Sequence, residues 1–238
     1  MRYILDLHTH TIASGHAYST LNENIHAAKK NGLKLLGVSD HAPMMPGSTH
    51  EFYFSNLRVI PEMVDGLRIL KGVELNILNR EGQIDLPDRE INHLDYGIAS
   101  LHIPCFDDLG SDGNTDAIIN AMKHPKVNII GHPDDGRYPL DYERLVIAAK
   151  EHKVLLELNN SSLAPTAFRK NARENYIQLL SLCEKYQVPV IFGSDAHYML
   201  DIGNFIYVEA LVESVGFPKS LIVNNNLDFL FSFVSTNK

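Results

Sequence analysis

The chain has 238 residues, 45% of them hydrophobic, and a formal net charge of −8, so it can bury one large core, and a single domain over residues 1–238 is expected. The acidic balance and the lack of a basic stripe argue against a nucleic-acid-binding protein, and no apolar run reaches the roughly 18 residues that a membrane span needs. The opening MRYILDLHTH lacks the order of a signal peptide, and Cys105 and Cys183 are too few for a disulfide framework, so a cytoplasmic enzyme is expected.

Seven short apolar runs along the chain predict β-strands. The runs are nearly continuous in hydrophobicity, as in parallel strands that are covered on both faces. The predicted strands are Tyr3–Leu7, Leu35–Ser39, Arg68–Leu75, Tyr96–Ser100, Val127–Ile130, Val154–Leu158 and Val190–Gly193.

Amphipathic segments between these runs predict helices. Asn114 or Thr115 is expected to cap one helix, and Gly32 follows another at the position of a C-terminal glycine. The predicted helices are Asn22–Asn31, Thr115–Met122, Asp141–His152 and Asn171–Tyr186, with closing helices after Asn204. Alternating strands and helices predict the α/β class with a parallel sheet. Seven strands without a clear eighth favour a distorted seven-stranded (β/α)7 TIM-like barrel, with a doubly wound open sheet as the competing architecture.

Polar, metal-ligating side chains follow the predicted strands at or just beyond their carboxyl ends. In a parallel barrel these ends converge on one face, where active sites are built. The residues in these positions are His8, His10, His41, Glu74, His102, His132, Asp195 and His197. A lone histidine after a strand is more often a hydrogen-bonded or surface residue, so their joint register is what indicates a metal site.

The spacing within this set adds detail. His8 and His10 are two residues apart, as are Asp195 and His197, so each pair points to one side of an extended strand. Nitrogen and oxygen donors without thiolate suit zinc, manganese or iron. His16, in the loop after the first strand, is by itself an even choice between ligand and bystander.

Further residues near the set are expected to support it. Asp6 would lie one step deeper and orient a ligand, and Asp40 is either an acid for the leaving group or a structural hydrogen-bond acceptor. Arg137 and Arg169, in loops after the fifth and sixth predicted strands, are candidates for substrate binding, because guanidinium groups hold phosphate in a bidentate manner. The role of His50, in the loop after the second strand, stays open.

Six ordered motifs, DLHTHTIASGHAYST, SDHAP, GVELNI, GHP, LELNNSS and GSDAH, make the chain resemble the PHP (polymerase and histidinol phosphatase) family, most closely its YcdX-type phosphatases. The resemblance runs from residue 4 to about residue 205. It implies a distorted seven-stranded β/α barrel that binds three divalent metal ions, commonly zinc. The implied ligands are His8, His10, Glu74 and Asp195 for one ion, Glu74, His102 and His132 for a second, and His16, His41 and His197 for a third.

The resemblance leads to a hypothesis for the activity. The chain would be a metal-dependent phosphatase that hydrolyses a small phosphomonoester through a hydroxide bridging two ions, with Glu74 and Asp195 as catalytic carboxylates. The alternatives are a histidinol-phosphate phosphatase, a PHP-type exonuclease and, in a different class, a non-enzymatic metal-binding module. The expected partner is a small phosphorylated substrate, with no nucleic acid and no membrane. The oligomeric state stays open, a homo-oligomer being one option.

Overall fold

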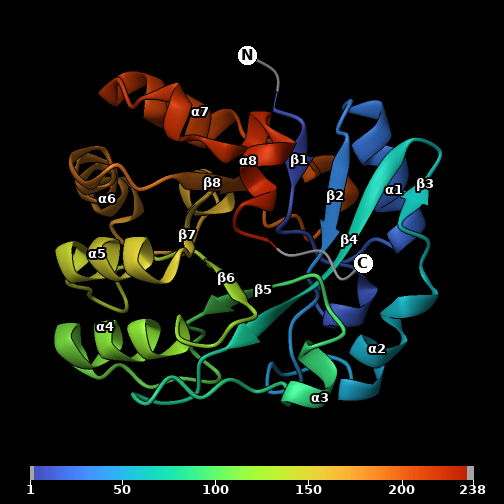
Figure 1. Ribbon diagram of the computed structural model, residues 1–238, viewed down its shortest axis with the longest axis horizontal. Helices are drawn as coiled ribbons and strands as arrows, with labels where there is room; N and C mark the ends of the chain where they lie inside the picture. The colour runs from blue at the N-terminus through green and yellow to red at the C-terminus, as the bar shows by residue number, and fades with distance from the viewer. Residues whose placement is uncertain (1–2, 235–238) are drawn as a thin grey trace.

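Seven parallel strands form a nearly closed barrel in the computed structural model, which describes residues 3–234 (Figure 1). The strands are β1 (Leu5–Asp6), β2 (Leu35–Val38), β4 (Leu67–Asn76), β5 (Tyr96–Ser100), β6 (Val127–Ile130), β7 (Leu155–Asn159) and β8 (Val190–Gly193). They neighbour one another in chain order, β1-β2-β4-β5-β6-β7-β8, without a reversal. Because a doubly wound sheet reverses its strand order at a switch point, the open-sheet alternative was wrong and the distorted seven-stranded barrel is confirmed.

A further short strand, β3 (Met63–Val64), pairs with β4 in antiparallel orientation. Asp65 and Gly66 join the two strands, and both have positive φ, 47° and 83°. Asp-Gly is a preferred sequence for a two-residue hairpin turn that needs positive φ at both positions. The sequence therefore contained a hairpin signal that the predicted strands did not include.

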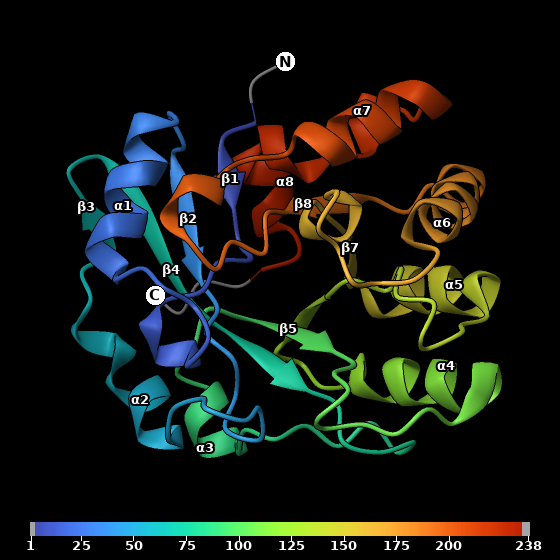
Figure 2. The same ribbon diagram turned by 180° about the vertical axis from the view of Figure 1, so that it is seen from behind.

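Helices surround the barrel. They are α1 (Leu21–Lys30), α2 (Glu51–Asn56), α3 (Asp88–Ile91), α4 (Gly110–Ala121), α5 (Tyr142–His152), α6 (Ala172–Tyr186), α7 (Ile206–Val215) and α8 (Leu227–Phe231). Helices α4, α5 and α6 lie side by side on one flank, and α1 lies on the opposite flank near β2 (Figures 1 and 2). The closing helices expected after Asn204 are α7 and α8. Within residues 3–234, no helix is long and apolar enough to cross a membrane.

Helix α4 begins earlier than the sequence predicted. It starts at Gly110, so Asn114 and Thr115 lie inside it and the expectation that either residue caps it was wrong. The Asn114 side chain accepts a hydrogen bond from the Leu109 backbone N–H at 2.9 Å. A Cβ on Gly113 would lie 2.5 Å from Cβ of Leu109. Because glycine is a weak helix former, Gly110 and Gly113 concealed this first turn.

Tyr96 fills the barrel interior below the carboxyl ends of the strands. It is fully buried, and its hydroxyl donates a hydrogen bond to the Leu7 carbonyl at 2.5 Å. Its ring lies where two other strands carry glycine. A Cβ on Gly37 would lie 2.1 Å from the Tyr96 hydroxyl, and a Cβ on Gly72 would lie 2.3 Å from Cζ of the ring. These two glycines therefore let one aromatic side chain pack β1, β2, β4 and β5 together.

The two ends of the strand path, β1 and β8, are connected through the buried side chain of Asn224. Its Oδ1 accepts from the Phe192 N–H at 2.7 Å, and its Nδ2 donates to the carbonyls of Phe192 and Leu5 at 2.8 and 3.2 Å. Nearer the carboxyl ends, Thr9 and Ala196 form a single parallel bridge. A side chain thus replaces part of the backbone ladder that would close the barrel.

The apolar run Leu221–Val223, to which the sequence assigned no element, places Asn224 there. Ile222 forms a parallel bridge with Val190 of β8, between two short 3-10 turns. After the run, α8 supplies Leu230, which is fully buried among the interior side chains of the barrel. The end of the described chain therefore closes the barrel beside β1 and β8 (Figure 1).

Asn224→Ala is expected to lower the free energy of unfolding by about 2–4 kcal/mol, because three hydrogen bonds are lost and buried backbone groups of two strands lose their partner. Urea denaturation measures the change. Asn226→Ala is the control, since Asn226 makes one exposed capping bond to Phe229 and its loss costs about 1 kcal/mol. Equal stability of the two variants would contradict the closing role of Asn224.

Candidate metal centre

The Glu74 carboxylate lies at the centre of a cluster of imidazoles at the carboxyl end of the barrel. Its Oε1 is 3.0 Å from His132 Nε2, 3.2 Å from His102 Nε2 and 3.3 Å from His8 Nε2. These histidines follow β6, β5 and β1. All four side chains reach the same point because parallel strands bring their carboxyl ends together.

The second oxygen of Glu74 faces another part of the cluster. Its Oε2 is 2.7 Å from His41 Nδ1 and 3.5 Å from His10 Nε2. Asp195 lies alongside, with its Oδ1 3.3 Å from His10 Nε2 and 3.5 Å from His197 Nδ1. One carboxylate therefore borders both halves of the cluster, and a second borders the histidines of β1 and β8.

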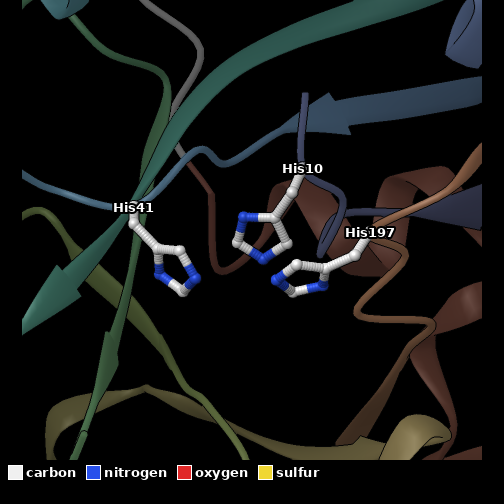
Figure 3. A group of neighbouring side chains, drawn as sticks. All are labelled: His10, His41 and His197. Atoms are coloured by element: carbon white, nitrogen blue, oxygen red, sulfur yellow. The ribbon is translucent and has the colours of Figure 1, made fainter. Parts of the chain in front are cut away.

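Figure 3 shows the rings of His10, His41 and His197 gathered around a common space. The ring centre of His10 is 4.4 Å from that of His41 and 4.3 Å from that of His197. His16 reaches the same space from the loop after β1, with its Nε2 3.2 Å from His41 Nε2. The structure thus brings together all nine residues that the strand register and the family resemblance singled out.

Several polar atoms in the cluster are buried and make no hydrogen bond of acceptable geometry, although they lie close to one another. They are His8 Nε2, His10 Nε2, His41 Nδ1 and Glu74 Oε2. Buried polar atoms are normally paired, so each unpaired one needs an explanation. Imidazole nitrogens and carboxylate oxygens facing one space are the donors that zinc and similar divalent ions bind. The residues present therefore fit a metal centre.

Within residues 3–234, three overlapping groups of side chains have atoms that could bind a metal ion within 4.8 Å of one another. They are His8, His10 and Glu74; His41, Glu74 and His102; and His10, His41 and His197. Glu74 is shared by the first two groups, and in the second of them His41 stands where the resemblance implied His132. In the third group His10 stands where the resemblance implied His16.

Hydrogen bonds on the far side of the rings fix which nitrogen faces the cluster. Nδ1 of His102 is 2.7 Å from Asn76 Oδ1, and Nδ1 of His197 is 3.0 Å from the Asp195 carbonyl. An acceptor at Nδ1 holds the proton there and leaves Nε2 with a free lone pair. Both rings thus present the nitrogen that a metal ion would bind.

Glu157 of β7 is a supporting residue that the sequence analysis missed. Its Oε1 is 2.6 Å from His8 Nδ1, and its Oε2 accepts from the His132 backbone N–H at 2.7 Å. It is 1% exposed. The signal was the motif LELN, in which Glu157 and Asn159 alternate on one face of a buried strand and so need polar partners.

Asp40 supports the site through Ser14. Its Oδ1 accepts from the Ser14 hydroxyl at 2.7 Å, and that hydroxyl lies 3.0 Å from His10 Nδ1. Thr11 and the hydroxyl of Tyr53 donate to the same carboxylate. Of the two roles that the sequence left open, this geometry matches the structural acceptor.

Asp6 supports a proposed ligand through the backbone. Its carboxylate accepts from the backbone N–H groups of His8, Ser194 and Gly203 at 3.3, 3.2 and 2.9 Å. It therefore fixes the backbone of the loops after β1 and β8, and with it the backbone of His8. Burial raises the pKa of Asp6 to about 6. His50, whose role was open, caps α2 by accepting from the Phe52 N–H.

Burial keeps part of the cluster uncharged. Burial, followed by the neighbouring rings of His197 and His41, holds the pKa of His10 well below its usual range. Burial likewise lowers the pKa of His102 to about 4. Neutral imidazoles are the form that binds metal ions.

A contact between two glycines positions the loop that carries His16. A Cβ on Gly15 would lie 2.0 Å from the Gly47 carbonyl oxygen, so the loops after β1 and β2 can touch only if residue 15 has no side chain. Gly15 also has a φ of +79°, which glycine adopts most readily. Ser48, next to Gly47, donates to the His41 carbonyl. The same contact therefore sets the position of His16 relative to His41.

A cavity of about 850 Å³ opens above the cluster. Arg169 lines it and is buried, with Nη2 3.1 Å from Asp195 Oδ2 and Nη1 2.9 Å from the Ser162 hydroxyl. Arg137 also lines it and is paired with Asp135. Both arginines singled out by the sequence thus lie at the cavity, each with a carboxylate partner.

Residues 6–237 match the PHP domain family, so the chain belongs to that family, as the motifs predicted. The chain is 44% identical over 241 residues to a probable phosphatase of Thermoanaerobacter sp. (strain X514), with 100% of this chain and 97% of the relative aligned. A probable phosphatase of Caldanaerobacter subterraneus subsp. tengcongensis is 46% identical over 229 residues, covering 96% and 89%. These relatives confirm the expected class, a hydrolase of phosphoric esters.

Solved structures share the fold. Histidinol phosphate phosphatase of Lactococcus lactis subsp. lactis Il1403, in complex with zinc, L-histidinol and phosphate, superposes with a TM-score of 0.64 at 20% identity, covering 91% of this chain and 95% of that one. A putative histidinol phosphatase from Listeria monocytogenes has a TM-score of 0.60 at 18% identity, covering 84% and 97%. At 18–20% identity these structures show that the fold is shared, and no more than the fold.

Glu157→Gln is expected to lower metal affinity about 10–100-fold, because one amide cannot accept hydrogen bonds on both ends as the carboxylate does for His8 and His132. Competition with a chelator, together with elemental analysis, measures the change, and circular dichroism checks the fold. Glu151→Gln, at an exposed position on α5, is the control. Unchanged affinity in Glu157→Gln would rule out the supporting role.

Gly15→Ala is expected to reduce bound metal to the level of His16→Ala, because the added methyl group pushes the two loops apart. Gly47→Ala and Gly66→Ala are matched controls, since φ is +84° and +83° there but an added Cβ meets nothing closer than 3.8 Å. Elemental analysis of the four variants gives the comparison. If Gly15→Ala and both controls lost metal to the same extent, backbone strain and not the loop contact would be the cause. If Gly15→Ala kept the metal content of the wild type, the loop contact would not position His16.

Proposed function

We propose that the chain is a phosphatase for a small phosphomonoester and that it works with three divalent metal ions, zinc in preference to manganese or iron. The observation that carries the proposal is the buried set of imidazole nitrogens and carboxylate oxygens around Glu74, of which four atoms make no hydrogen bond of acceptable geometry. The proposed ligands are His8, His10, Glu74 and Asp195 for one ion, Glu74, His102 and His132 for another, and His16, His41 and His197 for the third. The fold is shared with a Lactococcus lactis phosphatase whose complex contains zinc and phosphate.

Divalent ions bound in this cluster would supply positive charge for the phosphoryl oxygens and lower the pKa of an attacking water molecule. We propose Glu74 and Asp195 as the catalytic carboxylates. Glu74 borders both halves of the cluster with its two oxygens. Asp195 has one oxygen directed at His10 and the other held by Arg169. These contacts hold both carboxylate groups with their oxygens directed at the cluster.

We also propose that Arg169 and Arg137 contact the substrate from the cavity wall. Arg169 is closer to the reacting centre, because it touches Asp195 directly at 3.1 Å. Its Nη1 lies 3.2 Å from Asn159 Oδ1, so the guanidinium plane is fixed in advance. Fixed donors stabilise a phosphoryl group better than mobile ones.

The alternatives receive less support from the molecule. Histidinol phosphate is a reasonable candidate substrate, because the Lactococcus lactis neighbour is described with L-histidinol and phosphate bound. An exonuclease would need a basic surface for nucleic acid, whereas this chain has a net charge of −8. A non-enzymatic module would be expected to lack some ligands, and all nine positions are occupied by ligating residues.

Glu74→Ala is expected to abolish metal loading and to lower kcat/KM on p-nitrophenyl phosphate at least about a hundredfold, since the shared ligand is removed. Elemental analysis and a panel containing histidinol phosphate and a single-stranded oligonucleotide complete the measurement. Glu81→Ala, at an exposed loop position, should behave as wild type. After metal is removed with a chelator, added zinc should restore the activity of the wild type but not that of Glu74→Ala. A Glu74→Ala protein with full metal content and activity would refute the proposal.

A further inference from the structure

The cavity above the metal centre has an apolar wall that the proposed chemistry does not use. Beyond the ligands, its lining includes Met45, Leu101, Ile103, Pro104, Pro165 and Phe168. Two of these side chains are mostly exposed although they are large and apolar, Ile103 at 57% and Phe168 at 70%. They come from the loops after β5 and β7. Large apolar side chains that line a cavity next to polar groups are typical of ligand sites.

Phe168 is held in place by neighbouring charged side chains. Its ring centre lies 4.8 Å from Cζ of Arg137 and 5.6 Å from Cζ of Arg169. Each guanidinium is itself fixed by a carboxylate, Asp135 for Arg137 and Asp195 for Arg169. A cation near an aromatic ring is attracted to it. The exposed ring therefore lies against both guanidinium groups, one of which contacts Asp195 at the metal centre.

Two asparagine side chains in the wall have their oxygen atom already engaged. Asn160 Oδ1 accepts from the backbone N–H groups of Tyr207 and Val208, and Asn204 Oδ1 accepts from the N–H of Ile206. A leaving group rich in hydroxyls would have to compete with these hydrogen bonds. An apolar leaving group would instead cover Phe168 and Ile103 and gain from removing them from water.

We propose that Phe168 and Ile103 form the binding surface for the leaving group and that the site takes phosphomonoesters of aromatic or apolar alcohols in preference to sugar phosphates. This inference rests on the proposed function, because it assumes that the phosphoryl group binds at the metal centre. The leaving group then extends outward along the wall formed by the loops after β5 and β7.

Isothermal titration calorimetry of the zinc-loaded protein tests the inference independently of turnover. Benzylphosphonate and hydroxymethylphosphonate carry the same phosphonate and differ in the group that takes the place of the leaving group. Benzylphosphonate is expected to bind about tenfold more tightly, in keeping with burial of one aromatic ring. Phe168→Ala should remove most of this preference, leave the affinity for hydroxymethylphosphonate within about twofold, and be rescued in Phe168→Tyr.

Phe52→Ala is the matched control. Phe52 lies on α2, is 71% exposed and is not part of the cavity lining. It should bind both phosphonates as the wild type does. Ile103→Ala should weaken the binding of benzylphosphonate and not that of hydroxymethylphosphonate, to a smaller extent than Phe168→Ala does.

Equal affinity of the wild type for the two phosphonates would overturn the inference. A loss of both affinities to the same extent in Phe168→Ala would also overturn it, because the ring would then act only through Arg137 and Arg169. If the protein hydrolyses phosphoesters but binds the two phosphonates equally well, the inference about the leaving-group surface is wrong and the proposed function stands. If the protein prefers benzylphosphonate through Phe168 but hydrolyses no phosphoester, the proposed function is wrong and the binding surface is supported.

Discussion

The buried carboxylate of Glu74 is the constraint on which the rest of the site depends. An ionised carboxylate in a protein interior is strongly unfavourable unless it is paired. Here the compensation comes from histidines that follow four different strands. Only the assembled barrel brings these side chains to one point. The charge of Glu74 and the closure of the barrel therefore require each other, and ions bound among the ligands would couple metal affinity to folding stability.

Strand β7 supplies none of the proposed metal ligands, yet it holds several of them in place. His132 and Asp195 have positive φ, 30° and 54°, a conformation that is unfavourable for residues with a side chain. Glu157 of β7 binds the backbone N–H of His132, and Asn159 of the same strand donates to Asp195 Oδ2 at 3.1 Å. The strain is tolerated because β7 fixes both residues from behind. The precision of the ligand positions thus depends on a strand without ligands.

The sequence predicted the barrel and the gathering of the histidines and acids because both follow from one regularity, apolar runs of which all but that of β7 are followed by a side chain that can bind metal. It failed where the determining contact is distant or hidden. Glu157 lies inside an apolar run, and its partners His8 and His132 are far away in the chain. Asn224 pairs with Leu5 and Phe192 and leaves no local pattern. The domain boundaries and the role of each ligand stay predictions.

Most charges at the cavity are paired within the protein, which bears on how an acidic chain binds an anionic substrate. At the cavity, the two arginines are each neutralised by an aspartate, Arg137 by Asp135 and Arg169 by Asp195. Burial leaves His10 and His102 uncharged at neutral pH. Although burial opposes it, the carboxylates of Glu157, Glu74 and Asp195 raise the pKa of His8 well above its usual range, so one histidine cation partly offsets these acids. A divalent ion bound among these donors would supply positive charge for a phosphoryl group, which the paired arginines do not supply by themselves.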